Sequence, residues 1–470
     1  MTTQNVLIVG AGVAGEELIR EIKKHKELKI NPVGFIDDDK KKIGKKISGA
    51  SVLGTINNLK SFIKKFNIDK VLIALPSVDG SIISEVLKKS LEAGITCQTI
   101  PRVREIIEGK VDIRRVREVR IEDLLERPVR KHDAKDLSNL ITGNTVLVTG
   151  GAGSIGSELC RQIASYKPKK IVIFDWWENG LYEMGNEFKE FFPKTHHVLA
   201  IGNIQDKSRI DSIFRKYKPS LVFHTAAYKH VPLMEHNAIE AVKNNILGTK
   251  LLVEAAKKAN VKKFILISTD KAVEPKNVMG MTKFVGELIV NSANASGENN
   301  FFCVRFGNVL DSAGSVLPLF KKQIEKGELT ITDKKMTRYF MTIPEAVQLI
   351  LKAAVLGKGN EIFILDMGKP IKIVDLAKKF ILLSGLIPEK DIKIKFIGAR
   401  PGEKLNEELA EKGENIVKTK FEKILMVRRK KIDNRRLNIL IENLDKFCKL
   451  YNEKSALIRL KQFTEKVNVS

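Results

Sequence analysis

The sequence TVLVTGGAGSIG, residues 145–156, passes from an apolar run of strand length into three spaced glycines. A strand that turns into a helix through Gly150, Gly153 and Gly156 lets a pyrophosphate approach bare backbone amides at the positive end of the helix. The next predicted strand ends at Asp175, 19 residues after Gly156. A carboxylate there accepts hydrogen bonds from the adenosine ribose hydroxyls and repels a 2′-phosphate. The spacing therefore predicts a Rossmann-like unit that binds NAD rather than NADP.

A second glycine-rich turn lies near the start of the chain. A strand-like run leads into Gly10, Gly12 and Gly15, and Asp37 follows 22 residues after Gly15. A GxGxxG pattern without further support is weak evidence. Two interpretations stay open: a working cofactor site, or a nucleotide fold that is vestigial, regulatory or specific for another phosphorylated ligand.

Strand-like and helix-like segments alternate after both turns, which is typical of parallel sheets. We therefore predict an α/β protein with two tandem Rossmann-like domains, the second carrying a smaller α/β C-terminal lobe. The expected parts are an N-terminal nucleotide-binding-type domain (1–100), a charged linker (101–136), an NAD-binding domain (137–310), a substrate-binding lobe (311–425) and basic C-terminal helices (426–470).

Composition bounds the class of protein. The chain has 470 residues, 43% of them hydrophobic and 29% charged, close to the average of globular proteins. Its four cysteines form no CxxC pair and no cluster with histidine, so we expect reduced thiols and no metal site. The apolar runs are far shorter than the roughly 18 residues of a membrane helix. We expect a cytoplasmic protein without a signal peptide or transmembrane span.

The net charge is +26, from 82 Lys and Arg against 56 Asp and Glu. Such a charge suits nucleic acid, a membrane surface or a phosphorylated substrate, and it is also explained by surface solubility because lysines occur throughout the chain. Aromatic residues make up only 6%, and no nucleic-acid-binding module is recognisable. We therefore expect no nucleic-acid partner.

The most specific chemistry follows the predicted strand at residues 264–268. Thr269, Asp270 and Lys271 come at its end, and Met279 precedes Lys283 by four residues. This spacing resembles the short-chain dehydrogenase/reductase superfamily, where a YxxxK helix flanks the nicotinamide and its lysine lowers the tyrosine pKa. Met279 stands in the tyrosine position, and a thioether cannot take a proton. Either catalysis is lost or Asp270 and Lys271 do the acid–base work.

Seven ordered motifs give the chain a resemblance to the CapD-like polysaccharide-biosynthesis family, especially its long UDP-N-acetylglucosamine 4,6-dehydratases. They are VLVTGGAGSIGSEL (146–159), HTAAYKHVPLME (224–235), NNILGT (244–249), STDKAVEPKNVMGMTK (268–283), VRFGNVL (304–310), TRYFMTIPEA (337–346) and ARPGEKL (399–405). The N-terminal unit is similar too, so the resemblance covers nearly the whole chain. Long members usually begin with membrane helices, which this sequence lacks, so we expect a soluble member or a trimmed one.

The resemblance implies a mechanism. Bound NAD takes a hydride from C4 of the sugar, Lys271 takes the C5 proton, Asp270 protonates the departing C6 hydroxyl, and the hydride returns to C6. Lys283 holds the nicotinamide ribose, with Thr269 and Met279 in the usual hydroxyl and tyrosine positions. The acceptor of the C4 hydroxyl proton stays open among Thr269, Lys283 and water. Methionine-bearing long members retain configuration at C5, so retention is expected.

The resemblance and the glycine turn together imply the binding residues. The expected cofactor contacts are Gly150, Gly153, Ser154, Ile155, Gly156, Asp175, Ala226, Ala227 and Lys283. The expected substrate contacts are Lys229, Asn308, Arg338 and Arg400. The two arginines are chosen for the diphosphate because a planar guanidinium binds phosphate oxygens bidentately. The implied partners are a UDP-sugar, further copies of the chain in a dimer or larger assembly, and peripherally a glycan-assembly complex.

Two other functions stay open. A 4- or 5-epimerase would share the oxidation at C4 without eliminating water, and a non-catalytic nucleotide sensor would regulate glycan assembly. The missing tyrosine and the Asp270–Lys271 pair favour elimination over epimerisation. The presence of Asp270, Lys271 and Lys283 argues against a sensor.

Overall fold

The computed structural model describes residues 3–75, 78, 80–100, 116–125, 134–294, 300–398, 404–411, 414–428 and 433–469. The chain forms two compact units. The first comprises Met1–His132, Leu319–Lys334 and Lys372–Gly398, and the second comprises Asp133–Pro318, Lys335–Ile371 and Ala399–Ser470. The predicted α/β class with parallel sheets is confirmed, whereas the domain boundaries stay a prediction.

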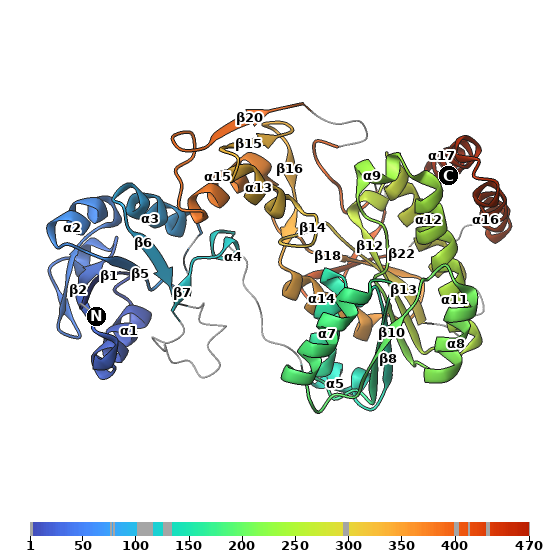
Figure 1. The fold of residues 1–470 in the computed structure, drawn as a ribbon, viewed down its shortest axis with the longest axis horizontal. Helices are drawn as coiled ribbons and strands as arrows, with labels where there is room; N and C mark the ends of the chain where they lie inside the picture. The colour runs from blue at the N-terminus through green and yellow to red at the C-terminus, as the bar shows by residue number, and fades with distance from the viewer. Residues whose placement is uncertain are drawn as a thin grey trace. The chain divides into compact units, whose positions relative to one another are not determined.

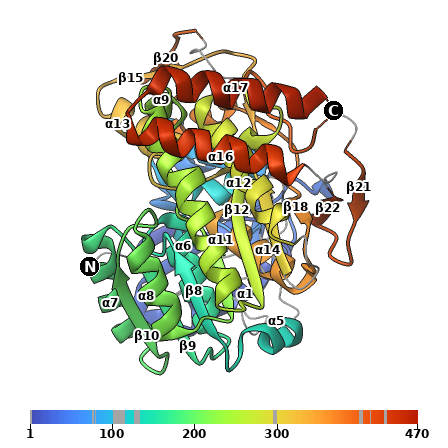
Figure 2. The ribbon, with the colours of Figure 1, turned by 90° about the vertical axis from the view of Figure 1, so that its right-hand side faces the viewer.

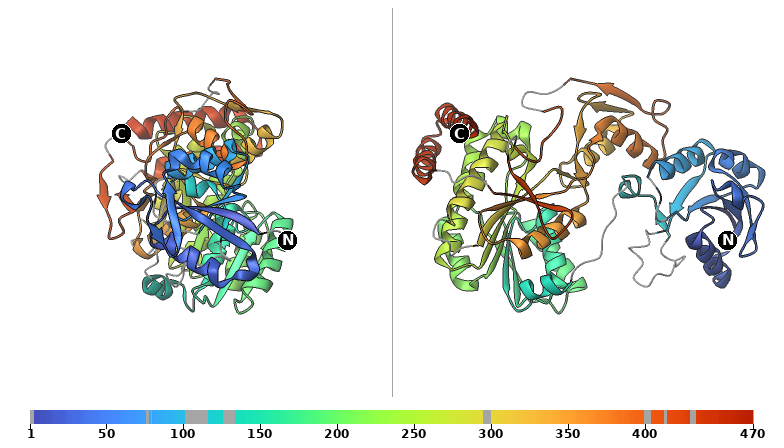
Figure 3. Two further views of the ribbon diagram at one scale, coloured as in Figure 1. Left: turned by 90° about the vertical axis from the view of Figure 1, so that its left-hand side faces the viewer. Right: turned by 180° about the vertical axis from the view of Figure 1, so that it is seen from behind.

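A seven-stranded sheet forms the centre of the first unit, and its five inner strands are parallel (Figures 1 and 3). The strand order is β3 (Lys46–Ile47), β4 (Ala50–Gly54), β2 (Ile30–Ile36), β1 (Gln4–Val9), β5 (Lys70–Ile73), β6 (Thr96–Thr99) and β7 (Arg117–Glu118). Its helices include α1 (Val13–Lys24), α2 (Leu59–Lys65), α3 (Gly80–Glu92) and α4 (Ile121–Leu124). Residues 6–9 of β1 are buried, as expected for a parallel strand covered on both faces.

Two segments from later in the chain complete this unit. Helix α15 (Ile373–Leu383) packs against α3, and Lys379 donates from Nζ to the carbonyl oxygen of Leu124 at 2.6 Å. Strand β15 (Glu328–Ile331) pairs in parallel with β20 (Lys393–Phe396). Both segments come from the region that the sequence assigned to the C-terminal lobe.

A nine-stranded sheet forms the centre of the second unit. The order is β10 (His197–Ile201), β9 (Lys170–Asp175), β8 (Thr145–Thr149), β11 (Leu221–His224), β12 (Lys263–Thr269), β13 (Asn300–Phe306), β18 (Glu361–Leu365), β22 (Ile424–Arg428) and β21 (Ile416–Lys418). The first seven are parallel, and β22 and β21 are antiparallel. In this doubly wound order, ligands bind outside the carboxyl ends of the central strands. The ends of β8 and β12 therefore share one edge.

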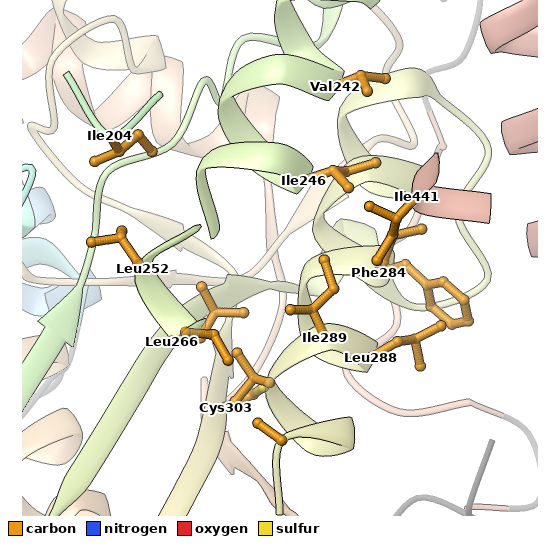
Figure 4. Packing of buried hydrophobic residues seen from close by; sticks show 14 of the residues in the cluster. Ile204, Val242, Ile246, Leu252, Leu266, Phe284, Leu288, Ile289, Cys303 and Ile441 are labelled. Carbon is orange, nitrogen blue, oxygen red and sulfur yellow. The ribbon is translucent and has the colours of Figure 1, made fainter. Parts of the chain in front are cut away.

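Helices cover both faces of this sheet. They are α5 (Ala134–Ile141), α6 (Ser154–Ala164), α7 (Glu178–Phe191), α8 (Lys207–Tyr217), α9 (Val231–Glu235), α10 (Ala238–Val242), a π-helical segment (Lys243–Gly248), α11 (Thr249–Lys258), α12 (Val278–Ser292), α14 (Ile343–Leu356), α16 (Asn434–Lys449) and α17 (Glu453–Val469). Helix α12 is buried along most of its length because it packs on β12 and β13 of the sheet and on α11, while α16 and α17 also lie against it (Figure 2). In the core shown in Figure 4, Phe284 and Ile289 of α12 belong to the same cluster as Leu266 of β12 and Ile441 of α16.

Short elements complete the second unit and border its site. Strand β14 (Asn308–Val309) pairs in parallel with β17 (Phe340–Met341), β16 comprises Thr337–Arg338, and a 3₁₀ turn spans Asp270–Ala272. The chain continues after β22 into the helices α16 and α17. Within the part of the chain described above, no helix has the combination of length and hydropathy that crossing a membrane requires.

Candidate active site

The turn after β8 requires glycine at two positions. Gly150 has φ = 69°, and a Cβ added there would lie 2.6 Å from the backbone nitrogen of Ala226. A Cβ added at Gly156 would lie 2.0 Å from the carbonyl oxygen of Gly150. The first amides of α6, at Ser154 and Ile155, have no acceptor within the helix and can bind an anion. Gly153 is the N-cap of this helix.

Asp175 binds the glycine turn through its carboxylate. Its Oδ2 accepts from the amide of Ala152 and its Oδ1 from that of Trp177, both at 3.0 Å. A carboxylate offers about four lone pairs, so acceptor capacity remains for ribose hydroxyls. Ser154 is also engaged, because its hydroxyl accepts from the amide of Ala313 at 3.0 Å. These contacts tie the loop after β9 and the loop at Ala313 to the glycine turn and the start of α6.

The end of β11 is bound to the same turn. The Thr225 hydroxyl lies 2.7 Å from the carbonyl oxygen of Thr149 and 3.1 Å from that of Gly150. Ala226 and Ala227 follow and are half-buried. The predicted cofactor residues of β8, β9 and β11 thus lie around one turn.

Thr269, Asp270 and Lys271 form a connected group at the end of β12. Asp270 is fully buried, and its Oδ1 accepts from the Thr269 hydroxyl at 2.8 Å and from Lys271 Nζ at 3.0 Å. Burial lowers the pKa of Lys271, but the charges of Asp270 and Glu407 outweigh burial and raise the pKa above its ordinary value. The resting pair is therefore an ion pair.

Glu407 belongs to this group and was not among the residues predicted from sequence. Its Oε1 lies 3.7 Å from Lys271 Nζ and 3.9 Å from Arg338 Nε. It follows the ARPGEKL motif by two residues. That motif indicated a functional segment, but no spacing rule connects Glu407 to a pair so distant in the sequence.

Arg338 holds the segment that carries Glu407. Its Nη1 donates to the carbonyls of Thr337 at 2.8 Å and Leu405 at 3.0 Å, and its Nη2 donates to that of Lys404 at 2.8 Å. The contact between Arg338 and a diphosphate stays a prediction. Arg400 lies outside the described residues.

Lys283 and Met279 are one turn apart on α12. Lys283 Nζ donates to the carbonyl oxygen of Ile267 at 2.7 Å. Burial lowers the pKa of Lys283 to about 8, with the charge of Glu287 opposing the shift. The Met279 side chain is buried in the hydrophobic core on which α12 packs, and its thioether offers no proton acceptor suited to catalysis.

A buried ion pair fixes α12 against the sheet. Arg305 of β13 donates from Nε and Nη2 to the two carboxylate oxygens of Glu287, at 2.8 and 2.7 Å. The Ser268 hydroxyl donates to Glu287 at 2.6 Å. Both charged side chains are fully buried, and removing one partner of such a pair strongly destabilises a protein. The network fixes Lys283 relative to Thr269.

Two predicted substrate residues remain, Lys229 on the loop after β11 and Asn308 at the start of β14. Lys229 Nζ lies 3.5 Å from the Ser312 hydroxyl, and burial lowers the pKa of Lys229. Asn308 follows Gly307, where an added Cβ would lie 3.1 Å from Asp270 Oδ2. The start of β14 therefore borders the group of Thr269, Asp270 and Lys271, and the substrate contacts of Lys229 and Asn308 stay predictions.

The fold and the site together define an extended short-chain dehydrogenase/reductase type of protein, with a glycine turn after the first strand and a Thr-Asp-Lys group after the fifth. The family described as polysaccharide biosynthesis protein matches residues 146–429, and a CoA-binding domain family matches residues 2–101. The chain belongs to the polysaccharide biosynthesis protein family.

Similar proteins agree with this assignment. The capsular polysaccharide biosynthesis protein CapD of Staphylococcus aureus is 44% identical over 93% of this chain and 74% of its own length. A UDP-N-acetylglucosamine 4,6-dehydratase (inverting) of Campylobacter jejuni is 38% identical over 59% of this chain and 80% of its own. The crystal structure of Pen from Bacillus thuringiensis is 33% identical, with a TM-score of 0.56, and covers 65% of this chain and 98% of Pen.

Proposed function

We propose that this chain is an NAD-dependent nucleotide-sugar 4,6-dehydratase that converts UDP-N-acetylglucosamine to the UDP-4-keto-6-deoxy sugar with retention at C5. The observation that carries the proposal is the ion pair of the buried Asp270 with the partly buried Lys271, hydrogen-bonded to Thr269 at the carboxyl edge of the sheet. Elimination needs an acid and a base side by side. The name of the Campylobacter relative supports the dehydration and the substrate class, whereas the relative is inverting, so the proposed retention rests on Met279 in the tyrosine position.

The residues of the second unit fit a dinucleotide. Gly150 and Gly156 leave no room for a Cβ, and the first amides of α6 point out of the helix as a site for the pyrophosphate. Asp175 would bind the adenosine ribose, and Lys283 the nicotinamide ribose. Bound NAD would supply reversible hydride transfer from C4 to C6.

Thr269 and Asp270 are suited to take the proton of the C4 hydroxyl. The threonine hydroxyl already donates to Asp270 Oδ1 at 2.8 Å, so a proton accepted by Thr269 can be passed to the carboxylate. Asp270 then carries the proton that the departing C6 hydroxyl needs. One proton enters Asp270 from C4 and one leaves it with water, so the carboxylate ends as it began.

Protonation of Asp270 also activates Lys271. Two carboxylates raise the pKa of Lys271 in the resting site. Neutralising Asp270 removes one of them, so the lysine releases its proton to water more easily and becomes the base for C5. Lys271 returns the C5 proton after C6 has been reduced and then regains its own from water.

The test is a mass measurement on UDP-N-acetylglucosamine incubated with Asp270→Asn and Lys271→Met proteins. We expect each variant to lose about 10²- to 10⁴-fold in turnover. A matched control is the exposed Lys207–Asp211 pair of α8, whose Asp211→Asn and Lys207→Met variants should keep full activity.

The product mass separates the rival reactions. A dehydratase product is lighter by one water, whereas an epimerase leaves the mass unchanged. The nuclear Overhauser contact between H3 and H5 of the product reports the configuration at C5. Near-normal turnover of both Asp270→Asn and Lys271→Met would refute the assignment of acid and base.

A further inference from the structure

Glu407 is a buried carboxylate that the acid–base scheme does not use. Only 7% of its surface is exposed. Its Oε1 faces Lys271 and Arg338, while its Oε2 has no hydrogen-bond partner within the described residues. An unpaired carboxylate oxygen is costly to bury, so such a group needs an explanation. A donor that arrives with a ligand would supply one.

The segment that carries Glu407 is held on two sides. Arg338 donates to the carbonyls of Lys404 and Leu405. Lys404 in turn donates from Nζ to the carbonyl oxygen of Val273, just after the catalytic turn, at 3.1 Å. Glu407 is therefore a positioned side chain of the site.

A second unpaired oxygen lies beside the same ammonium. Asp270 Oδ1 contacts Lys271, whereas Asp270 Oδ2 is buried without a hydrogen-bond partner in the described part of the chain. Gly307 borders this oxygen, because an added Cβ would approach it to 3.1 Å. Lys271 thus contacts two carboxylates, each with one unused acceptor oxygen.

Sugar chemistry restricts what these two oxygens can bind. If Lys271 takes the C5 proton, the substituents next to C5 must lie near both carboxylates. The ring oxygen carries no hydrogen, and the C4 oxygen becomes a carbonyl in the oxidation. The C6 hydroxyl is the neighbour of C5 that still has a hydrogen to donate and also accepts a proton as it leaves.

We propose that Glu407 binds the leaving C6 hydroxyl, with Oε2 accepting its hydrogen while Asp270 gives a proton to the same oxygen. The C6–O bond then breaks and water departs, still hydrogen-bonded to Glu407. Glu407 exchanges no proton in this step and keeps its contacts with Lys271 and Arg338. This inference rests on the proposed dehydratase function.

The test compares UDP-N-acetylglucosamine with UDP-6-deoxy-N-acetylglucosamine, which lacks the C6 hydroxyl. We measure kcat/KM for the first and the inhibition constant of the second. In Glu407→Ala, kcat/KM should fall about 10- to 100-fold while the inhibition constant changes less than about threefold. Glu407→Gln, which keeps an acceptor oxygen and nearly the same volume, should lose less. The matched control is Glu408→Gln at the exposed neighbouring position.

The outcomes are distinguishable. If Glu407→Ala changes kcat/KM for the substrate and the inhibition constant of the 6-deoxy analogue by the same factor, Glu407 acts through the local structure or through another hydroxyl. This result would overturn the inference. Unchanged kinetics in both Glu407 variants would overturn it too. Wild-type protein that neither binds nor dehydrates UDP-N-acetylglucosamine would overturn the proposed function, and the inference with it. Circular dichroism and thermal unfolding of Glu407→Gln verify that the comparison concerns folded protein.

Discussion

The two units contain the same glycine turn. Gly10 and Gly150 both have positive φ, of 108° and 69°. A Cβ added to Gly10 would lie 2.6 Å from the backbone of Ala74, just after β5, and a Cβ added to Gly150 would lie 2.6 Å from the backbone of Ala226, in the loop after β11. Gly15 and Gly156 lie one turn later. A Cβ there would come within 2.0 Å of the first glycine's carbonyl oxygen in both units.

The aspartates that follow are equivalent as well. The Asp37 carboxylate accepts a hydrogen bond from the amide of Ala11 at 2.8 Å, and the Asp175 carboxylate accepts one from the amide of Ala152 at 3.0 Å. Asp37 in addition pairs with Lys42 at 3.0 Å. A cation beside this carboxylate changes which anionic ligand the first unit would accept, so the shared turn does not imply a shared ligand.

The units differ most at the end of the fifth parallel strand. In the first unit this strand is β6, where the Thr99 hydroxyl donates to the carbonyls of Ile73 and Ile100. In the second it is β12, where the Thr269 hydroxyl donates to Asp270 instead. The same fold therefore carries a hydrogen-bonded Thr-Asp-Lys group in one unit and a backbone-bound threonine in the other, and the fold alone does not determine the function.

The largest expected effect tests whether the two turns are interchangeable. Gly156→Ala should lower the amount of dinucleotide that the purified protein retains at least tenfold, because the new Cβ cannot fit beside the carbonyl oxygen of Gly150. Gly15→Ala is the matched variant with the same clash in the first unit, and it should leave the dinucleotide of the second unit bound. Chromatography of the dinucleotide released on denaturation measures both. The reverse pattern would assign the cofactor to the first unit.

The glycine turns show what sequence alone can predict. Their glycine spacing and the end of the following strand at Asp175 were predicted as the structure has them, because local pattern determines both. The antiparallel strand β22 was missed, since its partner β18 lies far away in the sequence and its own run is short.

The candidate site was predictable only in part. Thr269, Asp270 and Lys271 are adjacent in sequence, so one motif reveals all three. Glu407 and the backbone contacts of Arg338 depend on a fold that brings residues from β12, β16 and a later loop together. Nothing local to Glu407 distinguishes it from the exposed Glu408 beside it.

A smaller effect concerns the buried lysine of the second unit. Because the pKa of Lys283 falls to about 8, the unfolded chain binds more protons than the native protein between about pH 8 and its ordinary pKa near 10.5. Wild-type stability should therefore rise with pH across that window. Lys283→Met should remove this slope and raise the unfolding free energy of dinucleotide-free protein by about 1–3 kcal/mol at pH 7.

The matched control for Lys283 is Lys23 of the first unit, an exposed lysine that also donates to a backbone carbonyl, that of Ser48. Lys23→Met should change the unfolding free energy by less than about 0.5 kcal/mol. Urea unfolding at pH 7 and pH 9.5 measures both variants. A Lys283→Met protein with a lower unfolding free energy than wild type would contradict the inference that burying the charge of Lys283 destabilises the fold.

The smallest expected effect concerns Asp37. Burial raises its pKa, but the amides of Asp39 and Ala11 and the charge of Lys42 outweigh burial, so the pKa lies below its ordinary value. A lowered carboxyl pKa stabilises the fold above the ordinary value of 3.8, and the contribution disappears as pH falls through the folded pKa. Asp37→Asn should therefore cost about 1 kcal/mol at pH 7 and progressively less below pH 4. Hydrogen exchange of the amides of Ala11 and Asp39 measures the loss. Exchange that accelerates equally at pH 7 and pH 3 would show that the charge of Asp37 does not hold the turn, and the analogy with Asp175 would then rest on backbone geometry alone.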